Sequence, residues 1–137
     1  MSEETRLREE MCLLAASLFA RGFSVGSAGN ISARLEDGVL ITPTNACLGR
    51  LDPVRIAKLD RAWRHVSGDR PSKEVFMHRA MLTARAEAGA VVHLHSTWAT
   101  AVSCLGSGLT TRTLRWRRCG LRRGRLRRGG RIGLRYA

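Results

Sequence analysis

The last 26 residues set the strongest limit on what this chain can fold into. From Arg112 to Ala137 the sequence holds 11 arginines and no acidic residue. Arginine outnumbers leucine and isoleucine there, so this segment lacks the apolar content that a packed core requires. A folded core must therefore come from the preceding 111 residues, which carry 13 basic and 11 acidic side chains. Of the net charge of +13, the tail contributes +11 and the preceding residues only +2.

The body of the chain has the features of a cytoplasmic domain. Its first residues, Met1-Ser-Glu-Glu4, are acidic, unlike a secretory or organellar leader. No apolar run approaches the 18 residues of a membrane-spanning helix. The four cysteines are scattered without a C-x-x-C pair, as in proteins of a reducing compartment. We therefore expect a cytoplasmic protein with no membrane span.

The first half of the body predicts a helix followed by a hairpin. Apolar residues at helical spacing predict a helix over residues 3–21, with Ser2 as its cap. These apolar residues are Leu7, Met11, Leu14 and Leu18. Strands over residues 31–34 and 39–42 flank an Asp-Gly turn and should pair with each other.

The second half of the body adds two short strands, a helix and a last strand. Residues 58–66 predict a pair of short strands, and Ser72 can cap a helix over residues 73–85. The expected apolar contacts of that helix are Val75, Met77, Ala80, Met81 and Ala84. Residues 90–95 predict a buried strand, and another helix should begin near Thr97. Hairpins mixed with helices predict an α/β or α+β domain with a mainly antiparallel sheet.

Two histidines in the last strand are candidate metal ligands. His93 and His95 are two residues apart, so a strand would present both imidazoles on one face. Two such nitrogens suit zinc, although two hydrogen-bonded sheet histidines would follow the same pattern. A zinc site also needs a third protein ligand. Neither His65 nor His78 stands at an obvious position for that ligand.

Glu74 follows Ser72-Lys73 at the expected start of the second helix. A carboxylate there is favoured by the helix dipole and could be a simple capping residue. It could also act as an acid or base toward a metal-bound substrate. Lys73 and the free N–H groups of the helix start favour a phosphate or carboxylate nearby.

Two loops offer further groups for an anion. Gly26-Ser-Ala-Gly-Asn30 has small residues that let backbone N–H groups approach a ligand, with an amide from Asn30. Thr42-Pro-Thr-Asn45 offers two hydroxyls and an amide after a strand. Both segments could equally be plain turns.

Taken together, the ordered segments resemble the class II aldolase/adducin family over about residues 5–106. The matching stretches are Gly29-Asn-Ile-Ser-Ala-Arg34, Asp37-Gly-Val-Leu-Ile-Thr-Pro-Thr44, Pro71-Ser-Lys-Glu74 and Ala90-Val-Val-His-Leu-His95. The resemblance implies an α/β/α sandwich with a central, mainly antiparallel sheet. It also implies a homotetramer with sites between subunits.

The resemblance assigns roles to individual residues. His93 and His95 match two of the three histidines that bind zinc in the family, and Glu74 matches its catalytic acid/base. Six residues fall where the family binds substrate phosphate: Gly29, Asn30, Thr44, Asn45, Ser72 and Lys73. The family's usual small residue before the catalytic acid is replaced here by Lys73.

The implied activity is that of a zinc-dependent carbon–carbon lyase acting on a sugar-acid phosphate. The segments most resemble the branch of 3-oxo-tetronate 4-phosphate decarboxylases, which implies decarboxylation through a metal-stabilised enediolate. Two alternatives stay open: a sugar-phosphate aldolase of the fuculose-phosphate type, and a non-catalytic, adducin-like binding module.

The chain departs from the family pattern at its C-terminal end. The third zinc histidine is absent, because no histidine follows His95. We place the aldolase-like domain at residues 1–110, incomplete at its C-terminus, and the Arg/Gly-rich tail at 111–137. The tail is expected to come from a reading-frame shift, or else to be a disordered arm that binds nucleic acid only non-specifically. With two zinc ligands, this chain is expected to be a poor or inactive enzyme.

Overall fold

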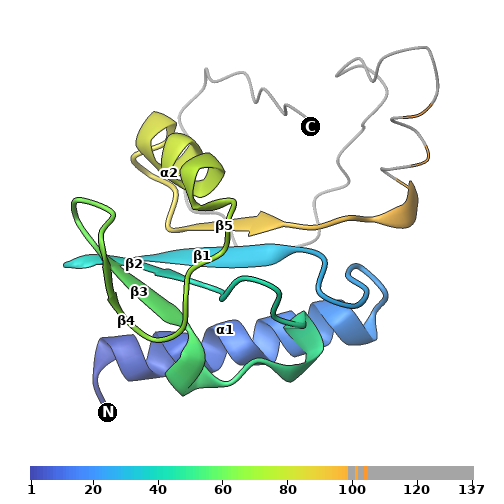
Figure 1. The fold of residues 1–137 in the computed structure, drawn as a ribbon, viewed down its shortest axis with the longest axis horizontal. Helices are drawn as coiled ribbons and strands as arrows, with labels where there is room; N and C mark the ends of the chain where they lie inside the picture. Colours follow the sequence, from blue (N-terminus) through green and yellow to red (C-terminus); the bar gives the residue numbers. More distant parts are fainter. Residues whose placement is uncertain (99–100, 102–103, 105–137) are drawn as a thin grey trace, which may run out of the picture. The chain divides into compact units, whose positions relative to one another are not determined.

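Two helices lie on opposite faces of a five-stranded sheet (Figure 1). This is a computed structural model, and it describes residues 1–98, 101 and 104. The sheet order is β4-β3-β2-β1-β5, and every neighbouring pair is antiparallel. Its elements are α1 (Glu3–Ala20), β1 (Asn30–Leu35), β2 (Gly38–Ile41), η1 (Leu48–Arg50), η2 (Pro53–Arg55), β3 (Ala57–Asp60), β4 (His65–Ser67), α2 (Val75–Ala84) and β5 (Ala90–His93). The expected α/β/α arrangement with an antiparallel sheet is confirmed for this part of the chain.

Helix α1 packs on the sheet along a narrow apolar stripe. Met11 and Ala15 are buried, and Leu7 and Leu18 pack against the same core. Leu14 shares the helical spacing of these residues, but its side chain is 48% exposed. The stripe passes through Ala15 instead, since a small residue lets the helix approach the sheet closely.

The cap of α1 is the one that the sequence predicts. Ser2 Oγ accepts a hydrogen bond from the backbone N–H of Thr5 at 3.1 Å. Replacing Ser2 by alanine is expected to lower the free energy of unfolding by about 1 kcal/mol, because that N–H loses its partner. Urea denaturation measures the change. The matched control is Ser17→Ala on the exposed side of α1, which should leave stability unchanged or slightly raised, and an equal loss in both variants would contradict the capping role.

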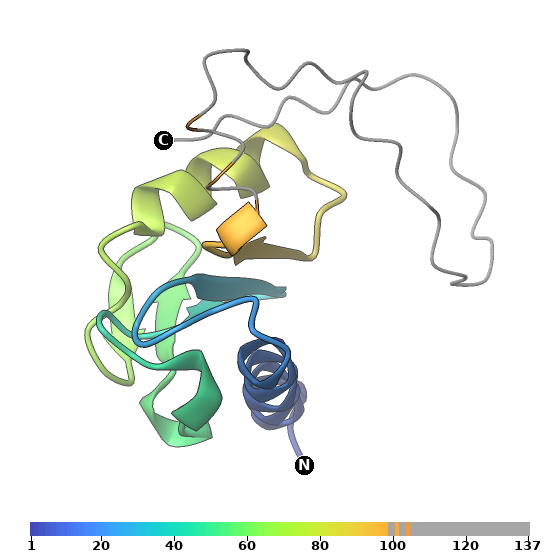
Figure 2. The same ribbon diagram turned by 90° about the vertical axis from the view of Figure 1, so that its right-hand side faces the viewer.

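The two faces of β1 have different partners. Ile31, Ala33 and Leu35 belong to the core beneath α1. Asn30 and Ser32 point to the other face, where α2 covers them, and both are buried. Figure 2 shows β1 between the two helices from a second direction. At Asn30 and Ser32 the polar side of this strand is therefore an interior surface, whereas Arg34 further along it is exposed.

Helix α2 differs from its prediction in its start and in its buried face. It begins at Val75, so Ser72 is not its cap residue, although Ser72 Oγ accepts from the N–H of Glu74 at 3.3 Å. Its buried residues are His78 and Leu82, whereas Met81 is 43% exposed. The reason is that α2 packs over the polar row of β1, so the inward-facing position is filled by a histidine that can bond to it.

Strand β5 also differs from its prediction. It ends at His93 rather than at residue 95, and it is buried at Val91 but 44% exposed at Val92. Within the described residues β5 is an edge strand, so one side of it has less cover than a central strand receives. Thr97 and Trp98 are helical, as expected. The predicted domain boundary near residue 110 and the tail lie outside the described residues.

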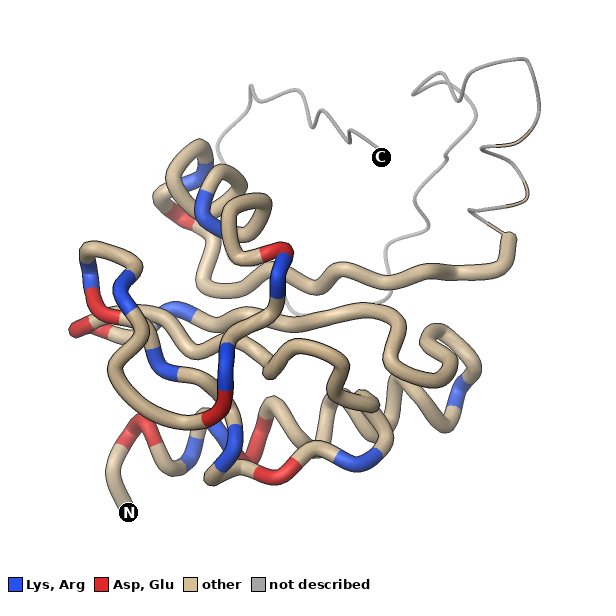
Figure 3. The backbone as a smooth tube through the Cα atoms, in the orientation of Figure 1, with Lys and Arg blue, Asp and Glu red and all other residues tan. Residues whose placement is uncertain are grey.

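Charges of both signs are mixed over the described part of the chain. Figure 3 shows Lys and Arg interleaved with Asp and Glu along α1 and the loops between strands. Several are paired; for example, Lys58 Nζ lies 2.8 Å from Glu4 and 2.7 Å from Asp37. Among the described residues, no helix combines the length and the hydropathy needed to cross a membrane.

Candidate metal centre

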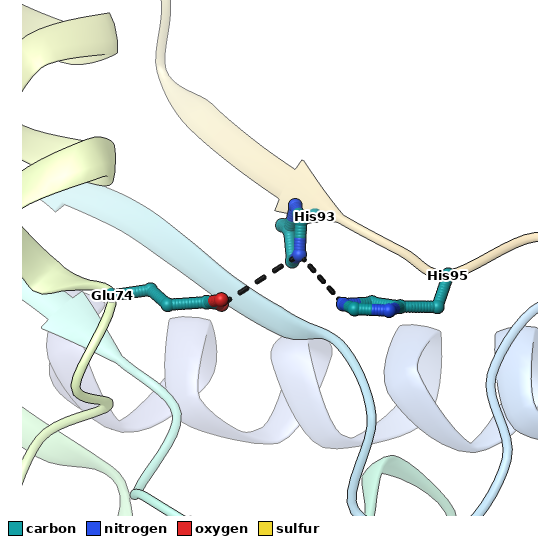
Figure 4. Close-up of side chains that lie close together, drawn as sticks. All are labelled: Glu74, His93 and His95. Atoms are coloured by element: carbon teal, nitrogen blue, oxygen red, sulfur yellow. Dashed lines mark hydrogen bonds and ion pairs between the residues drawn. The ribbon is translucent and has the colours of Figure 1, made fainter. Parts of the chain in front are cut away.

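Three side chains from two parts of the chain lie close together at one end of the sheet (Figure 4). Glu74 immediately precedes α2, His93 ends β5, and His95 follows two residues later. His93 Nε2 lies 2.9 Å from His95 Nε2 and 3.6 Å from Glu74 Oε2. All three donor atoms lie within 4.8 Å of one another. The structure therefore joins the two histidines singled out in the sequence to the candidate acid.

The donor set fits a divalent cation such as zinc. In a tetrahedral site with bonds of about 2.0–2.1 Å, neighbouring donor atoms lie about 3.3 Å apart. The separations from His93 Nε2, 2.9 Å to His95 and 3.6 Å to Glu74, lie on either side of that value, and no pair of the three donor atoms is more than 4.8 Å apart. Two imidazole nitrogens and a carboxylate oxygen are also a ligand set that catalytic zinc uses. Glu74 thus offers the third donor that spacing in the sequence did not reveal.

Local backbone geometry brings the start of β1 close to the end of β5 that carries His93. Gly29 has φ +82°, a conformation that favours glycine. A Cβ atom at this position would lie 2.9 Å from the carbonyl oxygen of His93. The absence of a side chain therefore lets the loop before β1 pass directly beside His93.

The Glu74 carboxylate is held in its ionised form. The Asn30 amide donates to Glu74 Oε2, and this hydrogen bond is the main reason that the pKa of Glu74 lies below its usual value. The positive potential of His93, when it is protonated, adds to the effect, while partial burial of the carboxyl opposes it. At neutral pH the group is a carboxylate, able to bind a cation or accept a proton.

A third histidine, missed as a functional candidate in the sequence, stands behind this centre. His78 is fully buried on the inner face of α2. Its Nδ1 lies 2.7 Å from Ser32 Oγ, and its Nε2 is hydrogen-bonded to Asn30 Oδ1. Burial lowers the pKa of His78 to about 4, so the ring is neutral at physiological pH. The spacing of four residues between Glu74 and His78 places both on one face of a helix, and it could have indicated in the sequence that His78 lies near Glu74.

Two segments that contain predicted phosphate ligands, residues 42–45 and 70–73, are joined to each other by backbone hydrogen bonds. The N–H of Thr44 donates to Arg70 at 3.0 Å, and the N–H of Ser72 donates to Thr42 at 3.1 Å. Thr42 is itself buried, and its hydroxyl accepts from Ile31, so it has a structural partner. These contacts bring together the segments that contain Thr44 and Ser72 just before Glu74.

The remaining predicted phosphate ligands differ in their surroundings. Thr44 and Asn45 line a pocket of about 280 Å³, together with Arg50 and Arg55. Lys73 is exposed next to Glu74. The side-chain amide of Asn30 is hydrogen-bonded to Glu74 through its NH₂ group and to His78 through its oxygen, so it has a structural partner on each side.

The profile of the class II aldolase and adducin N-terminal domain matches residues 9–128. That range covers most of the chain and ends within the Arg/Gly-rich segment. The chain belongs to the class II aldolase/adducin family. The resemblance deduced from its motifs is thereby confirmed, and the fold described above is the one this family shares.

Relatives within the family have named activities. A 3-oxo-tetronate 4-phosphate decarboxylase of Cupriavidus necator is 57% identical over 108 residues, which cover 77% of this chain and 49% of that protein. An L-fuculose phosphate aldolase of Escherichia coli is 36% identical over 107 residues, covering 78% of this chain and 50% of that protein. The chain therefore spans about half the length of the curated family members it matches.

Solved structures of the family agree with the fold described above. The crystal structure of YgbL from Escherichia coli superposes with a TM-score of 0.74 at 50% sequence identity, covering 77% of this chain and 51% of that one. An L-fuculose 1-phosphate aldolase structure gives a TM-score of 0.67 at 26% identity, with coverages of 76% and 50%. Both likenesses concern the part of the chain that contains the candidate metal centre.

Proposed function

We propose that this chain carries the metal-binding half of a zinc-dependent carbon–carbon lyase site. The observation that carries the proposal is the convergence of Glu74, His93 and His95 within 4.8 Å. The proposed reaction is decarboxylation of a 3-oxo-tetronate 4-phosphate, the substrate in the names of family members at 50–57% identity. The proposal includes assembly as a homo-oligomer, for which the exposed Phe76 on α2 offers apolar surface.

Each group of the chain has a defined task in this proposal. His93 and His95 hold the metal, whose contribution when bound is Lewis-acid stabilisation of negative charge on a substrate oxygen. Glu74 moves a proton at the carbon from which carbon dioxide departs. The loops of Thr44 and Ser72 bind the phosphate and hold the substrate in register, with Gly29, Asn30, Asn45 and Lys73 as further contacts.

A second candidate reaction is aldol cleavage of a fuculose-like phosphate. It uses the same metal chemistry and is supported by the 36% identity with L-fuculose phosphate aldolase. Product analysis separates the two reactions, because only the decarboxylase releases carbon dioxide. A non-catalytic binding module is the third candidate, but it has no physical need for an ionised carboxylate facing two histidines.

The deciding experiment is an assay of the purified 137-residue chain with 3-oxo-tetronate 4-phosphates and with fuculose 1-phosphate, in excess zinc. We expect slow release of carbon dioxide from the tetronate and no aldol cleavage of fuculose 1-phosphate. Turnover that persists after complete removal of zinc would refute the proposed mechanism. Aldol cleavage without carbon dioxide release would contradict the decarboxylase proposal and favour the sugar-phosphate aldolase reaction instead.

Zinc affinity should depend directly on the histidine pair. Replacing His95 by alanine removes one of three converging donors, so the dissociation constant for zinc should rise by about 100-fold or more. Competition with a chromogenic chelator measures it. His65→Ala, a change at an exposed histidine of β4, is the matched control and should bind zinc as the unmodified chain does. Equal affinities in all three proteins would place the zinc site elsewhere.

A further inference from the structure

A continuous line of hydrogen bonds connects the interior of the sheet to Glu74. Ser32 Oγ lies 2.7 Å from His78 Nδ1, and His78 Nε2 bonds to Asn30 Oδ1. The amide Nδ2 of Asn30 then donates to Glu74 Oε2. Ser32, His78 and Asn30 are all buried, so the line is closed off from water except at its Glu74 end.

Only one direction of proton donation satisfies every group in this line. A carboxylate accepts hydrogen bonds, so Asn30 must present its NH₂ group to Glu74 and its carbonyl oxygen to His78. His78 must therefore carry its proton on Nε2, which leaves Nδ1 as an acceptor for the hydroxyl of Ser32. If the Asn30 amide were turned around, an amide oxygen would face the carboxylate and two buried groups would lose their partners.

We propose that His78 is a positioning residue that fixes the Asn30 amide and thereby holds the Glu74 carboxylate facing His93. This rests on the proposed function, in which Glu74 is the acid/base and a neighbour of the metal. The atom held by Asn30 is Glu74 Oε2, the same oxygen that lies 3.6 Å from His93 Nε2. The ring of His78 is hydrogen-bonded to Ser32 and Asn30, and neither of these is a candidate metal ligand. Of the two partners, only Asn30 is predicted to touch the substrate.

Two substitutions of His78 separate positioning from simple packing. His78→Leu fills the space but cannot donate to Asn30, so the amide is free to turn. His78→Gln places an NH₂ group near the former Nε2 and can still donate to Asn30. Leu82→Ala is the matched control, because Leu82 is buried one turn further along the same helix face and belongs to an apolar cluster.

The experiment measures zinc affinity and turnover on the full chain, with circular dichroism and Tm to verify folding. We expect His78→Leu to raise the zinc dissociation constant about 10-fold and to lower kcat more than it raises KM. His78→Gln should recover most of both losses. Leu82→Ala should lower Tm while leaving zinc affinity and kcat near those of the unmodified chain at a temperature where it is folded.

A second readout needs neither zinc nor substrate. Long-range ¹H–¹⁵N correlation spectra of the metal-free chain should show His78 as the tautomer protonated at Nε2. A spectrum showing the proton on Nδ1 would overturn the proposal. It would also be overturned if folded His78→Leu kept the zinc affinity and kcat of the unmodified chain while Glu74→Gln lost turnover. If Glu74→Gln keeps full turnover, the proposed function fails instead, and the tautomer and the zinc affinities then decide the role of His78 by themselves.

Discussion

Glu74→Gln is expected to lower kcat by roughly 10²–10⁴-fold, the range that general acid–base groups contribute. Glutamine keeps the size of glutamate, and its side-chain oxygen can still accept from Asn30. What it removes is the charge and the capacity to take up a proton. The measurement is steady-state carbon dioxide release in excess zinc, so that weaker metal binding does not limit the rate.

The control for Glu74 is the same substitution at Glu87, which is exposed in the turn after α2. Glu87→Gln should leave kcat unchanged. Full turnover by Glu74→Gln would exclude the acid/base role and would favour the non-catalytic, adducin-like alternative. A rise in KM alone would instead assign Glu74 to substrate binding.

As the pH drops from 6.5 to 4, protonation of His78 alone is expected to lower the free energy of unfolding by about 3 kcal/mol. The pKa of His78 is lowered to about 4 in the folded protein by burial, from a usual value of 6.5. Between these pH values the unfolded chain binds a proton at this residue and the folded chain does not. The contribution is therefore fully present above pH 6.5, is lost as the pH falls through this window, and changes little below pH 4.

His78→Gln isolates this contribution, because it removes the titrating ring and leaves the carboxylates in place. Urea denaturation of both proteins at several pH values between 4 and 7 gives the free energy of unfolding of each. The difference between the two slopes against pH is the contribution of His78. Carboxyl groups with lowered pKa, such as Glu4 and Glu74, lose their stabilising effect mainly at the acidic end of the range, and they do so in both proteins. Parallel stability curves for the two proteins would show that His78 does not titrate with the expected shift.

Much of the fold follows from local patterns that the sequence displays openly. The helical spacing of Met11 and Leu18 and the cap at Ser2 predict α1, and the Asp-Gly turn predicts the β1–β2 hairpin. The errors occur where packing partners decide exposure. Leu14 follows the helical pattern but lies beside the contact stripe, and Val92 is apolar but lies on an edge strand.

The candidate site was only partly predictable for a related reason. His93 and His95 are neighbours in the sequence, so strand alternation alone suggests that they act together. Their approach to Glu74 depends on the packing of α2 against β5 and on the close passage of Gly29. No local spacing encodes such a contact. The assigned roles of these residues and of the phosphate ligands remain predictions until they are measured.

The sequence by itself determined the family, the order of the elements and the two candidate metal-binding histidines, because each depends on residue types at short spacing. Tertiary structure alone decided that Glu74 lies beside His93 and that His78 stands behind it. The physical reason lies in β1, where alternate side chains face opposite ways. The apolar set of β1 faces α1, whereas Asn30 and Ser32 are buried beneath α2. Buried polar groups need partners, and the helix packed above them supplies His78 and Glu74.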